Sequence, residues 1–172
     1  MCHHDPEDAE SAAVLSPEAL LAAISGHLDS AAPLVGWARE LAGLHAARMS
    51  EQADQVPRPI DVDTAAVRAE IARIIAAIDS WAAVHMPRNP DARKETHSLG
   101  EVLSHVAGTY VQARWTILHP ADEQVQRAAW RHLGEAQEGY GQLVADINTH
   151  DNRVPLVCNG NPNSNPWPGE RP

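Results

Sequence analysis

The chain of 172 residues has no phenylalanine, one lysine (Lys94) and two cysteines. Cys2 and Cys158 lie near opposite ends of the sequence, and two isolated thiols form neither a zinc cluster nor a disulfide framework. No uninterrupted apolar run approaches the roughly 18 residues that a membrane-spanning helix needs. The first ten residues are acidic and lack the apolar core of a secretory signal peptide. We therefore expect a soluble, cytoplasmic protein with no membrane partner.

Positive charge is also scarce, and the formal net charge at pH 7 is −10. A protein that binds nucleic acid needs a basic surface that displaces counterions from the phosphates, and no basic cluster is present. The sequence thus predicts no nucleic-acid partner, although a basic protein would suit so acidic a chain. The preference for arginine over lysine indicates a GC-rich coding sequence, such as that of an actinobacterium or one of its phages.

Four stretches carry apolar residues at alternating steps of four and three, the spacing of a stripe on one face of an α-helix. The connections between these stretches are short to moderate, so neighbouring helices should run antiparallel. The sequence therefore predicts an all-α fold, an antiparallel four-helix bundle with an additional short N-terminal helix. The stripes are Leu34, Trp37, Leu41 and Leu44; Val67, Ile71, Ile74, Ile78 and Trp81; Leu99, Leu103, Val106, Tyr110, Ala113 and Ile117; and Ala129, Leu133, Ala136, Tyr140, Leu143 and Ile147.

Capping residues predict where the helices begin and end. Ser16 and Pro17 form an N-cap and first position for the short helix, which should end near Gly26. The next helices should span about 33–53 and from Asp61 or Asp63 to about 85, the first of them ended by a proline-rich segment. Ser98 and Glu101 form a capping box for the helix that follows, and Pro120 should end it and begin the last helix, beside Asp122 and Glu123.

The two ends of the chain lack any apolar period. Residues 1–15 are acidic and polar, and residues 157–172 are rich in Asn and Pro. Neither segment can bury enough apolar surface to order itself, so both are expected to be disordered tails around a helical domain over 16–156.

Three glycines interrupt the last helix, at Gly134, Gly139 and Gly141. Each costs up to about 1 kcal/mol relative to alanine in a helix interior. The simpler explanation is close approach of a neighbouring helix or a local kink. The alternative is a backbone opening beside a pocket, which a bundle that binds a small molecule would need.

Histidines are the feature that invites an enzymatic interpretation. His97, Glu101 and His105 follow one another at four-residue steps and would share a helix face. Two imidazoles and a carboxylate could begin a divalent-metal site, with a further ligand from His45, His85 or His132. The simpler explanation is that Glu101 caps the helix and that the histidines are hydrogen-bonded residues of the core or rim. We expect no cofactor, with a divalent metal as the alternative.

No motif for nucleophilic catalysis, phosphate binding or dinucleotide binding is present. Ser104 and His105 are adjacent, so on a helix they would point about 100° apart. We therefore predict a non-enzymatic protein that binds a protein partner or a second copy of itself, as a regulator or a phage-encoded modifier of its host. Spare apolar, aromatic and Arg side chains off the main stripe motivate this prediction. They are Val111, Arg114, Trp115 and Leu118, with Trp167 in the tail as a further docking residue.

Several segments between about residues 33 and 156 carry helix signatures rather than catalytic motifs. They are Pro33-Leu34 to Leu44-His45-Ala46-Ala47-Arg48, Asp61-Val62-Asp63 to Ile78-Asp79-Ser80-Trp81, Thr96-His97-Ser98-Leu99-Gly100-Glu101-Val102, Gly139-Tyr140-Gly141-Gln142-Leu143-Val144 and Arg153-Val154-Pro155. Through these segments the chain resembles an actinobacterial family of small helical proteins of unknown function. The resemblance implies a compact helical bundle and carries no activity with it.

A shorter segment, Ser98 to Val106, is similar to the helix opening of the DinB-like four-helix bundles. That family consists of thiol-dependent metalloenzymes whose metal is held by three histidines. The resemblance implies that His105 matches the first ligand. The downstream pair of histidines one helical turn apart is missing, because His132 has no histidine four residues away.

Overall fold

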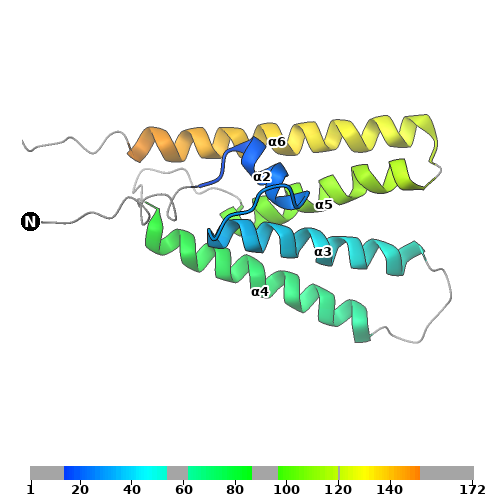
Figure 1. Cartoon of the computed structure of the whole chain (residues 1–172), viewed down its shortest axis with the longest axis horizontal. Helices are drawn as coiled ribbons and strands as arrows, with labels where there is room; N and C mark the ends of the chain where they lie inside the picture. The colour runs from blue at the N-terminus through cyan, green and yellow to red at the C-terminus, as the bar shows by residue number, and fades with distance from the viewer. Residues whose placement is uncertain (1–13, 54–61, 87–96, 120, 152–172) are drawn as a thin grey trace, which may run out of the picture.

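The computed structural model describes residues 14–53, 62–86, 97–119 and 121–151 (Figure 1). The predictions made for residues 1–13, Pro120, the Asn- and Pro-rich tail and Trp167 lie outside these ranges. Within them the protein is all-helical, with no β-strand, which confirms the all-α part of the predicted fold. No helix there is long and apolar enough to cross a membrane. The helices are α2 (Pro17–Ile24), α3 (Pro33–Ala53), α4 (Val62–His85), α5 (Leu99–Leu118) and α6 (Glu123–Asp151).

The predicted caps are present at the starts of α2 and α5. The Ser16 hydroxyl accepts a hydrogen bond from the Ala19 amide at 3.2 Å, and Pro17 occupies the first turn. At α5 the Ser98 hydroxyl accepts from the Glu101 amide, while the Glu101 carboxylate accepts from the Ser98 amide at 2.9 Å. Local sequence therefore determines these helix starts, because each side chain satisfies an amide that has no partner within its own helix.

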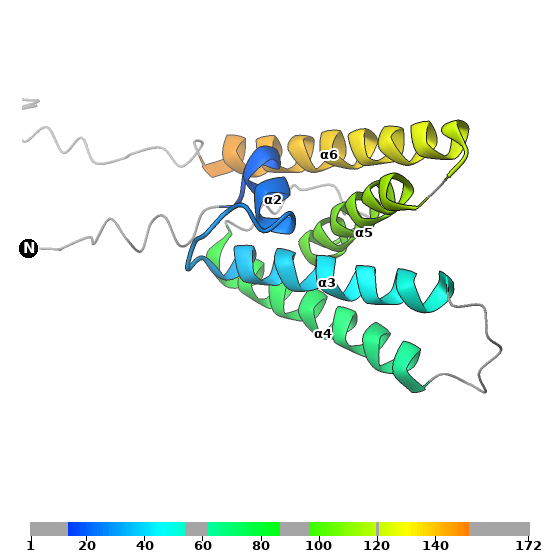
Figure 2. The same cartoon turned by 45° about the vertical axis from the view of Figure 1, so that its right-hand side comes forward.

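Helix α5 lies at the centre of the arrangement. It packs against α3, α4 and α6, while the short α2 packs against α3 and α6. Both views place α4 and α6 on opposite sides of α5 (Figures 1 and 2). This placement leaves α5 with one face toward α3 and α4 and another toward α6.

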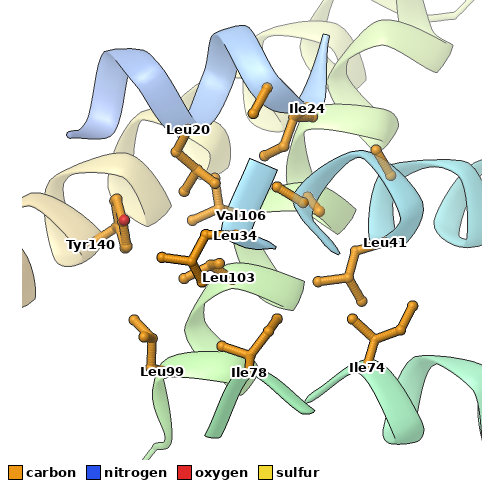
Figure 3. Close-up of a cluster of buried hydrophobic side chains, with 14 of the residues drawn as sticks. Leu20, Ile24, Leu34, Leu41, Ile74, Ile78, Leu99, Leu103, Val106 and Tyr140 are labelled. Atoms are coloured by element: carbon orange, nitrogen blue, oxygen red, sulfur yellow. The ribbon is translucent and has the colours of Figure 1, made fainter. Parts of the chain in front are cut away.

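One large apolar core joins the helices (Figure 3). It buries Ile71, Ile74, Ile78 and Trp81 of the predicted α4 stripe, whereas Val67 is only half-buried. It also includes the N-terminal half of α5, together with α2 and one side of α3. The completely or almost completely buried side chains include Leu20, Leu34, Leu41, Ile74, Ile78, Leu103, Val106 and Tyr140. At about 25 cal/mol per Å² of apolar surface removed from water, such burial is the main term that stabilises the fold.

The far end of the α5–α6 pair has a smaller, second core. It consists of Ala113, Ala129 and Leu133, with Leu21 and Tyr110 packed against it. The prediction that Ile117 belongs to the buried stripe is wrong, because its side chain is 57% exposed and Thr116 is buried instead. The buried face of α5 at this end therefore includes Ala113 and Thr116, and Thr116 is one residue away from the predicted stripe position.

Residues 14–16 precede α2 in the described part of the chain. Val14 and Leu15 are half-buried and pack against the large core, although the sequence assigned them to a disordered tail. The hydroxyl of Tyr140 on α6 donates a hydrogen bond to the Leu15 carbonyl at 2.6 Å. The helical domain therefore includes residues 14 and 15, earlier than the predicted boundary at 16.

Helices α4 and α5 lie in close contact at Gly100. A Cβ atom there would lie 2.5 Å from the Ile75 carbonyl oxygen and 3.0 Å from Asp79 Oδ1. The Gly100 amide donates to that Asp79 oxygen at 2.8 Å. A carboxylate from α4 thus caps the N-terminal, partly positive end of α5, and only glycine permits the approach.

Candidate functional site

A groove of about 1070 Å³ runs between α5 and α6. We call it the α5–α6 groove, and its described lining comes from α5, α6 and His97 just before α5. Four of the five residues that the sequence nominated for a metal or pocket line it: His97, Glu101, His105 and His132. The groove is also lined by Val102, Thr109, Gln112, Glu135, Ala136, Gly139, Tyr140, Gln142, Leu143 and Asp146.

The α5 wall of the groove begins at the capping box. His97 Nδ1 lies 3.6 Å from Glu101 Oε2, and the two side chains are 72% and 52% exposed. Further along, His105 is exposed, and Thr109 is buried with its hydroxyl donating to the His105 or Val106 carbonyl at 3.0 Å. Glu101 therefore has two roles, since the carboxylate that caps α5 also faces the groove.

The α6 wall presents the carboxylates Glu135 and Asp146 beside an apolar strip. Glu135 Oε1 lies 3.8 Å from Arg131 Nε, in an exposed ion pair. Ala136, Leu143 and the buried Tyr140 supply the apolar part, and burial raises the pKa of the Tyr140 hydroxyl. This wall therefore combines an uncharged, apolar strip with exposed charged side chains.

The glycines of α6 differ in their surroundings. A Cβ atom at Gly134 or Gly139 would meet nothing within 4 Å, and Gly139 lines the groove. At Gly141 it would lie 3.4 Å from the Pro17 ring, an ordinary van der Waals contact. Close helix approach thus does not explain Gly134 or Gly139, and the alternative of an opening beside a pocket fits Gly139.

The fifth nominated residue, His45, lies outside the groove. Its side chain on α3 is buried, and its Nε2 atom is 3.0 Å from the hydroxyl of Ser104 on α5. Burial, together with the positive charge of Arg48, lowers the pKa of His45 from 6.5 to about 4. A neutral imidazole that bridges two helices in the core is a structural residue. It shares no site with His105 or His132.

Sequence inspection missed the His45–Ser104 pair because 59 residues separate its members. A weak signal for it exists in Gly108, one turn after Ser104. A Cβ atom at Gly108 would lie 3.3 Å from His45 Cε1, so a small residue is needed where the ring packs. Arg48 Nε, one turn from His45, is buried without a hydrogen-bond partner among the described residues.

The described residues contain no group of three or more His, Cys, Asp or Glu side chains that could hold a metal ion. His85, a further ligand candidate, instead stacks on Trp81 with ring centroids 4.9 Å apart, and its Nδ1 lies 2.8 Å from the Trp81 carbonyl oxygen. What the groove offers in chemical terms is three imidazoles, three carboxylates and two amides around an apolar floor.

The nominated interface residues of α5 meet at a second, smaller concavity. Val111, Arg114, Trp115 and Leu118 line a hollow of about 350 Å³ between α5 and α3, which we call the α3–α5 hollow. Leu118 is 65% exposed there. The remaining lining residues are Ile24, Ser25, Arg39, Ala42, Gly43, Ala46 and Tyr110.

The chain matches no protein-family model, no curated protein and no solved structure.

Proposed function

We propose that this protein is a non-enzymatic binding protein whose α5–α6 groove receives an amphipathic, basic helix of another protein. The observation that carries the proposal is the lining of the groove. An apolar floor lies beneath the carboxylates Glu101, Glu135 and Asp146, and no Lys or Arg is among the described lining residues. An apolar floor with a rim of one charge is the pattern that binds an amphipathic helix of opposite charge.

The size of the groove suits a helix. From His132 to Asp146 the wall extends over 14 residue steps, which corresponds to about 21 Å at the α-helical rise. A partner helix of about four turns has the same length and would set one apolar stripe on Val102, Ala136 and Leu143. Its flanking Lys or Arg side chains would then reach the carboxylates on both walls.

Two carboxylates of the rim, Glu101 and Glu135, form exposed pairs that can be exchanged. Glu101 faces His97 at 3.6 Å and Glu135 faces Arg131 at 3.8 Å, and both pairs are exposed. Exposed ion pairs of this kind contribute little, typically below about 1 kcal/mol. A basic partner can therefore replace these pairs with its own contacts to Glu101 and Glu135 at low energetic cost. Binding of the partner should weaken as salt screens the charges.

We also propose that the four long helices form an antiparallel bundle. The colour order in Figure 1 has α3 and α5 running in one direction and α4 and α6 in the other. This supports an antiparallel four-helix bundle in which α2 is an additional helix between α3 and α6. An actinobacterial or phage source and a cytoplasmic location remain part of the proposal, resting on sequence alone.

The proposal is tested with three synthetic helical peptides of about 14 residues that share one leucine stripe. Their polar faces carry Lys, Gln or Glu, and binding is measured by isothermal titration calorimetry at two salt concentrations. We expect the Lys peptide to bind most tightly and to lose affinity at high salt. Equal binding of all three peptides would contradict the proposal.

A matched pair of variants locates the peptide. Glu135 lines the groove, whereas Glu138 is exposed on the same helix and does not line it. Glu135→Lys should lower the affinity for the Lys peptide by tenfold or more. Glu138→Lys should lower that affinity much less, although both substitutions change the net charge equally. A similar loss in both variants would show that binding follows the net charge and not the groove.

The divalent-metal alternative makes a different prediction. A metalloenzyme built on His105 would contain about one metal ion per chain after purification without a tag or chelator. Inductively coupled plasma mass spectrometry measures this directly. A stoichiometric metal that is lost in His105→Ala with helicity unchanged would replace the proposed function with the metal site.

A further inference from the structure

The α3–α5 hollow carries positive charge although the chain as a whole is acidic. Arg39 from α3 and Arg114 from α5 both line it, and neither forms an ion pair with an Asp or Glu among the described residues. No Asp or Glu is among the described lining residues either. Two guanidinium groups without carboxylate partners at one concavity favour an anionic occupant.

Each guanidinium is partly oriented by a neutral oxygen. Arg39 Nη2 donates a hydrogen bond to the Leu28 carbonyl at 2.7 Å, and Arg114 Nη1 donates to the Tyr110 hydroxyl at 3.4 Å. The contact with Tyr110 also raises the pKa of Arg114. A guanidinium has five N–H donors, so each side chain retains donors for a carboxylate.

The walls of the hollow suit an apolar body. The α3 side consists of small residues that leave space for a ligand, Ala42, Gly43 and Ala46. The α5 side consists of the larger residues Val111, Trp115 and Leu118. A Cβ atom at Gly43 would meet nothing within 4 Å. The Trp115 ring is held by stacking on His119, with centroids 3.8 Å apart. The volume of about 350 Å³ is at the small end of ligand sites.

From these observations we infer that the α3–α5 hollow binds a small organic carboxylate with an apolar body. The carboxylate lies between Arg39 and Arg114, and the body packs against Trp115 and Leu118. This site is separate from the α5–α6 groove and takes a ligand of the opposite charge. The inference therefore does not depend on the proposed function.

The test uses three probes with one body and different head groups: 4-phenylbutyrate, 4-phenylbutanamide and 4-phenylbutylamine. Binding to the full chain is followed by the indole N–H signal of Trp115 in ¹⁵N–¹H spectra, identified with Trp115→Phe. For a ligand of about twelve heavy atoms we expect a Kd on the order of a millimolar or below. The carboxylate probe should need the lowest concentration to shift the Trp115 signal, and the amine probe should need the highest.

Variants separate the charge from the apolar wall. Arg114→Gln should lower the affinity for phenylbutyrate by about tenfold or more, because a charge-assisted hydrogen bond is lost. The affinity for the amide probe should stay unchanged. Leu118→Ala should lower the affinity for the carboxylate probe and for the amide probe by the same factor. Arg39→Lys should retain part of the affinity, since the charge is kept and the bidentate geometry is lost.

The matched control is Arg127→Gln on α6. Arg127 is exposed, pairs with Glu123 and does not line the hollow, so its loss changes the net charge by the same amount. It should leave phenylbutyrate binding unchanged. Equal affinity for all three head groups, no shift of the Trp115 signal at several millimolar phenylbutyrate, or an equal loss in Arg127→Gln would each overturn the inference.

Discussion

At the scale of single residues, the histidines show how position decides chemistry. His97, His105 and His132 are exposed at the α5–α6 groove, while His45 is buried against Ser104. Their sequence neighbourhoods do not distinguish His45 from His132, because both lie on or beside apolar stripes. The buried environment of His45 depends on α3 and α5 being packed together, which periodicity alone does not specify.

His45 should make the stability of the protein depend on pH. The pKa of its imidazole is lowered to about 4 by burial and by Arg48, against 6.5 in the unfolded chain. The unfolded state therefore binds the proton first, so the stabilisation is complete above pH 6.5 and is lost as the pH falls toward 4. A shift of this size corresponds to at most about 3 kcal/mol. Urea unfolding at pH 7.5, 6, 5 and 4.5 measures it.

His45→Gln provides the comparison for this prediction. The amide can keep a hydrogen bond to Ser104 but does not titrate, so the loss of stability between pH 6.5 and 4 should be smaller than in the wild type. His132→Gln, which removes an exposed histidine, should follow the wild-type curve. If wild type and His45→Gln lose stability in parallel, the buried imidazole does not control the acid response.

At the scale of the helices, the sequence was most informative where the chemistry is local. The bounds of α3, the N-cap of α2 and the capping box of α5 followed from residues within four positions of one another. The exposure of Ile117 and the packing of Leu15 depend on neighbouring elements, and the sequence pattern predicted neither. The sequence placed His97, Glu101 and His105 on one helix face, which is a local property, whereas the α5–α6 groove that they line requires two helices.

Two glycines differ in whether a neighbouring helix or only their own helix determines the effect of a substitution. Gly100→Ala would place a methyl group against the backbone of α4, so it should destabilise the fold by about 1–3 kcal/mol. Gly134→Ala has open space and should stabilise α6 by up to about 1 kcal/mol through helix propensity. Urea unfolding of both variants at pH 7.5 measures the two changes. Equal stability of Gly100→Ala and the wild type would show that α4 and α5 can separate freely at this point.

At the scale of the whole molecule, hydrogen bonds between described residues join elements that are distant in sequence. The hydrogen bond from Tyr140 to the Leu15 carbonyl spans 125 residues and connects the segment before α2 to α6. Since α2 also packs on α3, this contact helps to join the N-terminal part of the chain to the α5–α6 pair. The placement of α6, and with it the wall of the α5–α6 groove, should therefore depend on this buried hydroxyl.

The two tyrosines of the chain allow that dependence to be measured. Tyr140→Phe keeps the ring but leaves the Leu15 carbonyl without its partner, so it should destabilise the fold by about 1–3 kcal/mol. Tyr110→Phe removes only a 3.4 Å contact with the exposed Arg114 and should change the stability little. Both values come from urea unfolding at pH 7.5, where an unchanged m-value indicates that the same surface is exposed.

Alkaline pH gives an independent measure of the same residue. Burial raises the pKa of Tyr140 above the value of about 10 in an unfolded chain. Below pH 10 both states keep the proton, and above it the unfolded state loses the proton first, so the stabilisation falls as the pH rises. This decline should be smaller in Tyr140→Phe than in Tyr110→Phe. If both variants match the wild type at neutral and alkaline pH, the hydroxyl of Tyr140 contributes nothing to holding α6 against the N-terminal segment.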